Sequence, residues 1–294
     1  MIEVSVIMLA YNHEHYIAQA IEGVLGQQVD FEMELIVADD CSSDRTSSVV
    51  QDYKNNHLNG NLINYIGHQV NIGVQPNFLT ALKFSKGKYI ALCEGDDFWV
   101  DPFKLQNQLQ ILKTNPEYVI CCTNASFVNE GGVLLKKEML PAEGKTIGIL
   151  DFLQNVNPII SCTAVFKTDA LKDYGFIKDY VFGDWALWAH LLADTHEGKA
   201  VYLEGVTASY RKHQAGIFNG LDRVRKLQNK KYNFLVFKAK HPDYSAKIEE
   251  VVKKINSGII LEYLHNRQKL KGIGFYLFHK NNMGTKQLFN HLKG

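Results

Sequence analysis

Polar and acidic side chains follow three strand-like runs near the start of this chain. Residues 4–9 lead into Ala10, Tyr11 and Asn12, residues 34–38 lead into Asp39 and Asp40, and residues 88–93 lead into Glu94, Gly95, Asp96 and Asp97. The runs are short, nearly continuously apolar and rich in Val and Ile, which is typical of parallel strands buried on both faces. Because ligands bind outside the carboxyl ends of such strands, we expect these side chains to meet in one crevice.

Several carboxylates in one crevice are costly to bury unless positive charge compensates them. A divalent cation, with a substrate that completes its coordination, would supply that charge. Glu94 and Asp96 lie two residues apart directly after a strand, so both side chains point the same way if extended geometry continues. Oxygen ligands suit Mg²⁺ or Mn²⁺, which often bridge substrate phosphates. An acid-x-acid triplet alone is usually a solvated turn, but Asp39 and Asp40 at a second strand end favour a metal–nucleotide site.

Segments with helical periodicity separate the strand-like runs. Apolar residues recur on one helical face at Ile17, Ile21, Val24 and Leu25, at Phe78, Leu79 and Leu82, and at Leu105, Leu109 and Leu112. This alternation predicts an α/β domain with a Rossmann-like, mostly parallel sheet flanked by helices. We expect two further strands at residues 61–66 and 118–122, after which the pattern becomes looser.

The second half of the chain mixes element types. Gly131-Gly132 predicts a hairpin turn, residues 159–166 a strand, and residues 184–192 a helix with Asp184 capping its start. Past Asn219 the chain is expected to be helical, with apolar residues at helical spacing at Ile248, Val251, Val252, Ile255 and Ile259. We therefore divide the chain into a domain over residues 1–218 and a basic helical extension over residues 219–294.

Length and composition fit a globular protein. The chain has 294 residues, of which 46% are hydrophobic, and this supplies an ordinary core. No apolar run is long enough to cross a bilayer, and the early first strand predicts that no signal peptide precedes the fold. The five cysteines have neither an even count nor zinc-type spacing. We therefore expect a reducing, cytoplasmic location.

The net charge of +1 conceals an uneven distribution. Residues 219–294 hold 16 Lys and Arg against 5 Asp and Glu, whereas residues 1–218 hold 16 against 26. The basic part suits an anionic partner, such as peripheral contact with an anionic membrane surface, or it consists of solvated helix faces. Residues 275–278, between Lys271 and Lys280, are apolar and would touch the membrane or form a homodimer interface. We expect no nucleic-acid partner.

Several familiar nucleotide and metal motifs are absent from the sequence. There is no G-x-x-x-x-G-K-[ST] phosphate loop and no G-x-G-x-x-G after the first strand. The run His13-Glu14-His15 does not predict a zinc-binding helix, because its two histidines would face different directions. The acidic crevice is therefore the best-supported site.

The order of motifs resembles the inverting family 2 glycosyltransferases with a GT-A fold. The matching segments are VSVIMLAYNHEHYIAQAIEGVLGQ, ELIVADDCSSDRT, NIGVQPNF, GKYIALCEGDDFW, GDWALWAHL and YRKH, which follow in the family's order over residues 3–213. The resemblance implies metal-dependent transfer of a hexosyl or N-acetylhexosaminyl group, with Mn²⁺ or Mg²⁺ as cofactor. The donor would be a nucleotide-diphosphate sugar, expected to be UDP-linked. The acceptor would be a hydroxyl of a saccharide or lipid-linked molecule in cell-surface polysaccharide synthesis.

The resemblance assigns nucleotide contacts to the first two strand ends. Ala10, Tyr11 and Asn12 match the loop whose backbone and aromatic ring hold the base and ribose. Tyr11 could instead be a packed loop aromatic. Asp39 matches the carboxylate that accepts a hydrogen bond from the base, often uracil, and Asp40 matches the same loop.

The resemblance assigns the diphosphate and metal to the third strand end. Glu94, Gly95 and Asp96 match the metal–diphosphate motif, in which Asp is more common at the first position. The longer side chain of Glu94 leaves a ribose contact open, whereas Asp96 is expected to be a direct metal ligand. His213 in YRKH matches a late histidine that contacts metal or diphosphate in relatives, although a lone loop histidine is more often not a ligand. The Arg and Lys of YRKH would neutralise diphosphate charge or face solvent.

Asp184 matches the general base of the family. Relatives often have Glu-Asp where this chain has Gly183-Asp184, which leaves Asp184 as the local candidate. A carboxylate there would take the proton of the acceptor hydroxyl on the face opposite the departing nucleotide. One base without an enzyme nucleophile implies inversion at the anomeric carbon. The competing interpretation is a plain helix N-cap.

Other interpretations stay open from the sequence. The departures at Glu94 and Gly183 are compatible with a nucleotide-binding GT-A-like module that has no transfer activity. A metal-dependent phosphatase or nucleotidyl transferase is a third class, although the nucleotidyl version lacks its Gly-rich Arg/Lys loop. Trp99, Trp185 and Trp188 could stack on sugars, but tryptophans at such positions more often belong to the core.

Overall fold

The computed structural model describes residues 1–137, 145–154, 157–195, 198–214, 216, 220–265, 271, 275 and 279. Within these residues the strands are β1 (Val4–Ala10), β2 (Met33–Asp39), β3 (Ile63–Gly67), β4 (Tyr89–Leu92), β5 (Phe98–Trp99), β6 (Tyr118–Asn129), β7 (Leu134–Lys137), β8 (Thr146–Ile147), β9 (Val165–Lys167) and β10 (Lys199–Lys212). They form one sheet in the order β3-β2-β1-β4-β9-β6-β10-β5, with β7 beside β6 and β8 beside β10. Most paired residues run parallel, which confirms the expected sheet.

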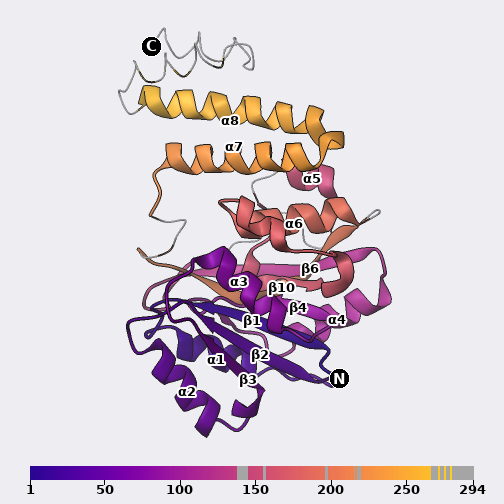
Figure 1. Cartoon of the computed structure of the whole chain (residues 1–294). Helices are drawn as coiled ribbons and strands as arrows, with labels where there is room; N and C mark the ends of the chain where they lie inside the picture. Colours follow the sequence, from indigo (N-terminus) through magenta and orange to yellow (C-terminus); the bar gives the residue numbers. More distant parts are fainter. Residues whose placement is uncertain are drawn as a thin grey trace.

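Helices cover both faces of this sheet (Figure 1). The α-helices are α1 (Ile17–Leu25), α2 (Thr46–Asn56), α3 (Val74–Phe84), α4 (Lys104–Thr114), α5 (Ile149–Gln154), α6 (Gly183–Asp194), α7 (Arg223–Lys240) and α8 (Ser245–His265). Short 3-10 helices are η1 (Gly60–Leu62), η2 (Ser161–Thr163), η3 (Thr168–Ala170), η4 (Gly175–Asp179) and η5 (Pro242–Tyr244). Helices α1, α2 and α4 pack on one apolar face of the sheet, and α3, α5 and α6 pack on the other.

One strand is longer than the sequence pattern predicts, and the strand beside it is not predicted at all. The strand expected at residues 118–122 continues as β6 to Asn129, and the 14-residue β10 beside it was not foreseen. Polar side chains interrupt the apolar pattern of both strands, but they pair with each other across the sheet. The Thr123 and Thr207 hydroxyls lie 2.6 Å apart, and those of Ser126 and Ser209 lie 2.7 Å apart. Mutual hydrogen bonding therefore lets these polar positions stay buried.

The expected strand at residues 159–166 is wrong in most of its length. Residues 161–163 form η2, and the strand β9 begins only at Val165. Side chains take the carbonyl groups that a neighbouring strand would otherwise bond. The Trp99 indole donates to the Cys162 carbonyl at 2.7 Å, and the Gln108 amide donates to the Thr163 carbonyl at 2.8 Å. The hairpin turn at Gly131-Gly132 is confirmed between β6 and β7, with Gly132 at a φ of 79°.

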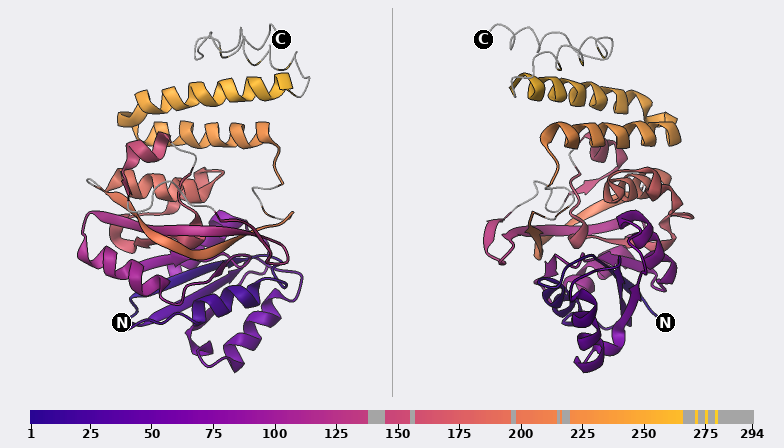
Figure 2. Two further views of the ribbon diagram at one scale, coloured as in Figure 1. Left: turned by 180° about the vertical axis from the view of Figure 1, so that it is seen from behind. Right: turned by 60° about the vertical axis from the view of Figure 1, so that its left-hand side comes forward.

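The C-terminal helices α7 and α8 are layered on helix α6. Figures 1 and 2 show α6 between the sheet and α7, with α8 on the far side of α7. Trp185 of α6 lies 4.8 Å from the ring of Phe234, and the Asn233 amide donates to the Phe182 carbonyl at 3.0 Å. The predicted helical face of α8 is confirmed, because Ile248, Val251, Val252, Ile255 and Ile259 are all buried.

The helices α7 and α8 therefore share a core with α6. The proposed boundary between residues 218 and 219 lies outside the described residues, so the division into two domains stays a prediction. In the described part of the chain, no helix combines the length and the hydrophobicity that a membrane span requires. Of the apolar segment 275–278, only Phe275 is described, and it lies 6.4 Å from the ring of Tyr263.

Candidate functional site

The loops that follow β1, β2 and β4 lie side by side, as the sequence predicts. Ala10 pairs with Asp39 at the ends of β1 and β2, and the Gly95 amide donates to the Leu9 carbonyl at 2.9 Å. Asn12 adopts a left-handed conformation with a φ of 55°, which Asn tolerates better than most residues. The backbone N–H of Asn12 donates to the Ser42 hydroxyl at 2.9 Å, and this hydrogen bond connects the loop after β1 to the loop after β2.

Tyr11 and Asp39 differ in what they leave available to a ligand. Tyr11 is 48% exposed, so the alternative of a packed loop aromatic does not apply. Asp39 is buried and accepts hydrogen bonds from the amide and hydroxyl of Ser42, at 2.9 and 2.5 Å, and from the Tyr65 hydroxyl at 2.8 Å. A carboxylate offers about four lone-pair sites, so one remains for a further donor.

The carboxylate of Asp40 is bonded to the backbone of a neighbouring loop. Its two oxygens accept hydrogen bonds from the amides of Ile72 and Gly73, at 2.7 and 2.8 Å. Gly73 has a φ of 89°, a conformation that favours glycine, and α3 starts immediately after it. Asp40 therefore fixes the loop that leads into α3.

The acidic triplet after β4 contains a buried acid with an unused oxygen. Glu94 Oε2 is buried and, among the described residues, has no hydrogen-bond partner. Burial and the nearby negative charges of Asp96 and Asp184 raise the pKa of Glu94 to about 8. Gly95 is required by close packing, because a Cβ there would lie 2.8 Å from Nδ1 of His13. The triplet is thus pressed directly against the loop that follows β1.

Asp96 lies beside two histidines. Asp96 Oδ2 is 2.8 Å from Nε2 of His213, and the ring of His213 lies 6.4 Å from that of His13. Burial alone would raise the pKa of Asp96, but His213 and His13 together lower it. The hydrogen bond to Asp96 raises the pKa of His213, whereas burial lowers the pKa of His13. The predicted pair Asp96 and His213 therefore meets in the structure.

His13 is the site residue that the sequence analysis missed. Its Nδ1 is buried and has no hydrogen-bond partner in the described part of the chain. The two histidines of His13-Glu14-His15 do diverge, as expected, and the side chain of His15 is 74% exposed. The left-handed turn at Asn12 directs the chain so that His13 meets Gly95. A histidine directly after this turn was the signal, but the spacing rule for zinc helices does not detect it.

Arg211 takes neither of the two expected roles. It is buried, and its guanidinium donates to the carbonyls of Asp96 and Glu130 at 2.9 and 2.8 Å and to the Gln19 side chain at 2.7 Å. Its backbone amide donates to the Asp97 carboxylate at 2.8 Å, so Asp97 is structural. Arg211 therefore holds the backbone of Asp96 in place, because its donors are already used within the protein.

Asp184 faces the same crevice from the start of α6. Phe182 occupies the N-cap position and Asp184 lies in the first turn, so the expected N-cap role of Asp184 is wrong. Its Oδ2 accepts a hydrogen bond from the Asn157 amide at 2.7 Å. Burial raises the pKa of Asp184, although its hydrogen bonds to the Trp185 backbone and Asn157 oppose the shift. The charge of Asp184 in turn raises the pKa of Glu94, so the two acids share one environment.

The tryptophans belong to the core, as the more common alternative suggests. Trp99, Trp185 and Trp188 are each at most 4% exposed. Trp185 and Trp188 pack against the phenylalanine rings of Phe152 and Phe166, both 5.8 Å away. None of the three therefore offers a ring face to a sugar.

The donor set of the crevice fits a divalent cation. Asp96 and His213 bring one carboxylate and one imidazole together, the ring of His13 lies 6.4 Å from that of His213, and both Nδ1 of His13 and Oε2 of Glu94 are buried polar atoms that lack a partner within the described residues. Carboxylate oxygen with imidazole nitrogen suits Mn²⁺, whereas Mg²⁺ prefers oxygen ligands and water. The chemistry of these residues thus agrees with the predicted metal site and favours Mn²⁺.

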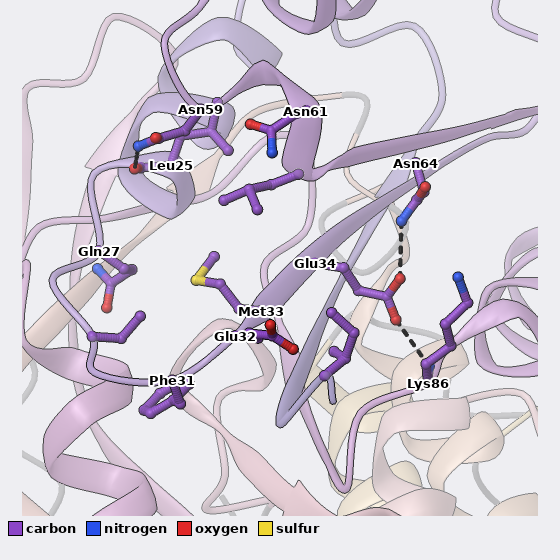
Figure 3. A pocket seen from close by; sticks show the side chains of 13 residues that line it. Leu25, Gln27, Phe31, Glu32, Met33, Glu34, Asn59, Asn61, Asn64 and Lys86 are labelled. Atoms are coloured by element: carbon purple, nitrogen blue, oxygen red, sulfur yellow. Dashed lines mark hydrogen bonds between the residues drawn. The ribbon is translucent and has the colours of Figure 1, made fainter.

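A cavity of about 590 Å³ lies at the opposite end of the sheet (Figure 3). Met33, Glu34 and Asn64, near the amino ends of β2 and β3, contribute to its lining. Both oxygens of Glu34 accept hydrogen bonds. Oε1 accepts from the Ser5 hydroxyl at 2.6 Å and the Lys86 backbone N–H at 2.9 Å, and Oε2 accepts from the Asn64 side chain at 2.9 Å. Because its acid is satisfied internally, this cavity has no comparable signature of a reactive site.

The sheet and the crevice at its carboxyl end define an α/β protein of the GT-A class. The crystal structure of S. aureus TarS in complex with UDP-GlcNAc has a TM-score of 0.64 at 18% identity, covering 86% of this chain and 71% of that chain. The mannosyltransferase PcManGT from Pyrobaculum calidifontis, in complex with GDP-Man and Mn²⁺, also has a TM-score of 0.64 at 18% identity, covering 95% and 75%. At these identities the similarity shows the fold.

The sequence comparisons identify the family. The model described as Glycosyl transferase family 2 matches residues 5–175, and the chain belongs to this family. WfgD of Escherichia coli, named a UDP-Glc:alpha-D-GlcNAc-diphosphoundecaprenol beta-1,3-glucosyltransferase, is 30% identical over 217 residues, which cover 73% of this chain and 79% of WfgD. An uncharacterized protein of Mycobacterium tuberculosis is 33% identical over 216 residues, or 73% of this chain. The match spans 60% of the length of that mycobacterial relative.

Proposed function

We propose that this protein is a metal-dependent, inverting glycosyltransferase. It transfers a sugar from a UDP-linked donor to a hydroxyl of a saccharide or lipid-linked acceptor in cell-surface polysaccharide synthesis. One observation carries the proposal: an acid–imidazole group, Asp96 with His213 beside His13, lies close to a second, partly buried carboxylate, that of Asp184, whose charge raises the pKa of Glu94. The first group suits a metal-bound diphosphate, and the second suits a general base.

The nucleotide would occupy the loops after β1 and β2. The backbone of Ala10 and Asn12 and the half-exposed ring of Tyr11 would contact the base and ribose. Asp39 keeps one lone-pair site for an N–H of the base, while Ser42 and Tyr65 hold its carboxylate in position. Asp40 contributes indirectly by fixing the loop before α3.

Asp96 and His213 would hold the cation, with His13 as a third ligand. Mn²⁺, or Mg²⁺ in its place, would neutralise the charge that develops on the departing diphosphate. Arg211 keeps the Asp96 backbone in position through its hydrogen bond to the Asp96 carbonyl. Gly95 allows His13 to approach, because any larger residue would occupy the position of the imidazole. Glu94 would line the ribose and diphosphate from the same strand end.

Asp184 would accept the proton of the acceptor hydroxyl. The Asn157 amide orients its carboxylate, and burial raises its pKa, which makes it a stronger base than a solvated aspartate. The acceptor oxygen forms a bond to the anomeric carbon as the bond to the diphosphate oxygen breaks. With a single base and no covalent intermediate, an α-linked donor gives a β-linked product.

The acceptor is proposed from the named relative. The name of WfgD gives its acceptor as alpha-D-GlcNAc-diphosphoundecaprenol. We therefore propose that the acceptor here is a saccharide linked to a lipid diphosphate. Peripheral contact of the basic C-terminal part with an anionic membrane would bring the enzyme to such a substrate. Flotation with liposomes should then depend on anionic lipid, and flotation that is independent of lipid charge would remove this element.

A product assay separates the proposed activity from its alternatives. The protein would be incubated with Mn²⁺, a UDP-sugar and a lipid-linked saccharide acceptor, and the products would be analysed by mass spectrometry. Intact UDP together with a glycosylated acceptor is the expected result. Release of inorganic phosphate would indicate a phosphatase instead. Nucleotide binding without any product, across UDP-, GDP-, dTDP- and CMP-linked donors, would support the binding module without transfer activity.

A further inference from the structure

A second group of metal-ligating side chains lies at the far end of α6. His190 and Asp194 are one helical turn apart on α6, and His241 follows the last residue of α7. Nδ1 of His190 is 3.2 Å from Oδ2 of Asp194 and 3.1 Å from Nε2 of His241. Nδ1 of His241 lies 3.7 Å from the other oxygen of Asp194. Three potential ligands from two helices thus converge on one point.

The hydrogen bonds within this group depend on which ring nitrogens carry protons. If Nδ1 of His190 carries a proton, Asp194 and His241 must share that single donor. If it does not, its lone pair can accept a hydrogen bond from Nε2 of His241 but also faces a carboxylate oxygen 3.2 Å away. The Tyr180 hydroxyl lies 2.9 Å from Nε2 of His190 and can accept a hydrogen bond from an N–H there, which leaves the Nδ1 lone pair directed at Asp194 and His241. A cation would accept electron pairs from all three groups.

Two of the separations between the potential ligand atoms match a tetrahedral zinc site, and all the atoms lie within 4.8 Å of one another. Zinc–nitrogen bonds of about 2.0–2.1 Å place neighbouring ligands of a tetrahedron about 3.3 Å apart. The separations of 3.1 and 3.2 Å around Nδ1 of His190 are close to this value. Two imidazoles with one carboxylate favour Zn²⁺ over Mg²⁺ or Ca²⁺. The Tyr180 hydroxyl has the position of the outer partner that orients a zinc-bound histidine.

We propose that His190, Asp194 and His241 bind one Zn²⁺ that joins α6 to the end of α7. The two imidazoles are already held by stacked rings, Phe176 on His190 at 3.7 Å and Phe237 on His241 at 4.3 Å. The side chain of Asp194 is 42% exposed, so the ion has a path from solvent and water can fill the fourth position. This zinc site does not depend on the proposed glycosyltransferase activity.

The zinc site is separate from the crevice but acts on the same helix. Asp184 and Asp194 lie ten residues apart on α6, which corresponds to about 15 Å along the helix axis. Zinc at the far end would therefore fix the position of α6 against α7 without touching the reacting groups. This makes His190, Asp194 and His241 positioning residues with respect to Asp184.

The test uses the full chain with the crevice disabled by Asp96→Asn and His213→Gln, so that cations bound there do not interfere. Metal-free protein is titrated with Co²⁺, whose visible absorption reports tetrahedral coordination, and its thermal unfolding is followed with and without Zn²⁺. We expect one Co²⁺ equivalent with a tetrahedral spectrum. Zn²⁺ at a hundred times its dissociation constant should raise Tm by roughly 5 °C.

Variants assign the ligands. Adding Asp194→Asn or His241→Gln should abolish both the spectrum and the zinc-dependent shift, and Tyr180→Phe should weaken zinc binding by about tenfold. Asp194 is exposed, so Asp194→Asn decides the matter even if His241→Gln does not fold. The proposal is overturned if the background protein shows no tetrahedral Co²⁺ spectrum or zinc shift, or if both survive Asp194→Asn.

Discussion

Two glutamates with buried carboxylate oxygens, at opposite ends of the sheet, show how differently the fold treats the same side chain. Glu34, near the amino end of β2, has both oxygens hydrogen-bonded within the protein. Glu94, at the carboxyl end of β4, has a buried oxygen without a partner among the described residues, and burial raises its pKa to about 8. The first arrangement satisfies its acid within the protein, whereas the second leaves an acceptor to which a ligand could bind.

The described cavity lies at the Glu34 end of the sheet and not at the Glu94 end. The cavity of about 590 Å³ lies beside Glu34, yet its acid is already satisfied. The unpartnered atoms Oε2 of Glu94 and Nδ1 of His13 lie at the other end, where the loops after β1 and β4 meet. The comparison teaches that a cavity does not by itself mark the candidate site, because the acid with an unsatisfied oxygen lies away from it. The predictions below test this difference, beginning with the largest effect.

Asp184→Asn should give the largest loss. The amide keeps the size of the side chain but cannot take a proton, so kcat should fall by roughly 10²- to 10⁴-fold. UDP affinity should stay within about twofold, because Asp184 contacts Asn157 and not the nucleotide loops. Steady-state kinetics and calorimetric UDP titration measure the two quantities. The exposed Asp169→Asn is the matched control, and an equal loss of UDP binding in Asp184→Asn would contradict the role as a base.

His13→Asn should weaken manganese-dependent donor binding by roughly 10- to 100-fold, a range typical for disturbed metal sites. The reason is that Nδ1 of His13 is buried beside Gly95 and close to Asp96. His15→Asn, two residues away and exposed, is the control and should bind the donor as the wild type does. Titration of UDP in Mn²⁺ and in EDTA measures the effect. Equal affinities for the two variants would remove His13 from the site.

The pH profile of transfer should follow the protonation of Asp184. A base works only when deprotonated, and burial raises the pKa of Asp184 above its ordinary value. The rate should therefore fall about tenfold per unit as the pH decreases below this raised pKa, and it should level off above it. Measurement of kcat between acidic and neutral pH shows the inflection. Asn157→Ala should move the inflection further up, because the hydrogen bond that stabilises the carboxylate is lost.

Glu34→Gln should affect stability and leave catalysis unchanged. The side-chain NH₂ of the glutamine would face either the backbone N–H of Lys86 or the side-chain NH₂ of Asn64, so two donors would meet. The free energy of unfolding should therefore fall by about 1–3 kcal/mol. Denaturant unfolding and transfer kinetics measure the two effects. A strong loss of kcat in Glu34→Gln would mean that both ends of the sheet take part in function, and the comparison would fail.

The sequence predicts most of the residues that form the candidate nucleotide and metal site. Continuous apolar runs identified β1, β2 and β4, and parallel pairing then brings Asp39, Glu94 and Asp96 together. The strand β10 was missed because its hydroxyl side chains are satisfied only by partners on β6, far away in the sequence. Similarly, the structural role of Arg211 depends on carbonyls contributed by distant segments. Local patterns cannot reveal partners that only the folded sheet supplies.

The most direct test of the account compares wild-type protein with Asp96→Asn in thermal unfolding with UDP, in Mn²⁺ and in EDTA. The account predicts that UDP with Mn²⁺ stabilises the wild type by about 2.7 kcal/mol at a hundred times the dissociation constant. In Asp96→Asn, or in EDTA, most of this stabilisation should disappear, because Asp96 and His213 would hold the cation that binds the diphosphate. Equal stabilisation of both proteins by UDP, irrespective of metal, would contradict the proposed metal site.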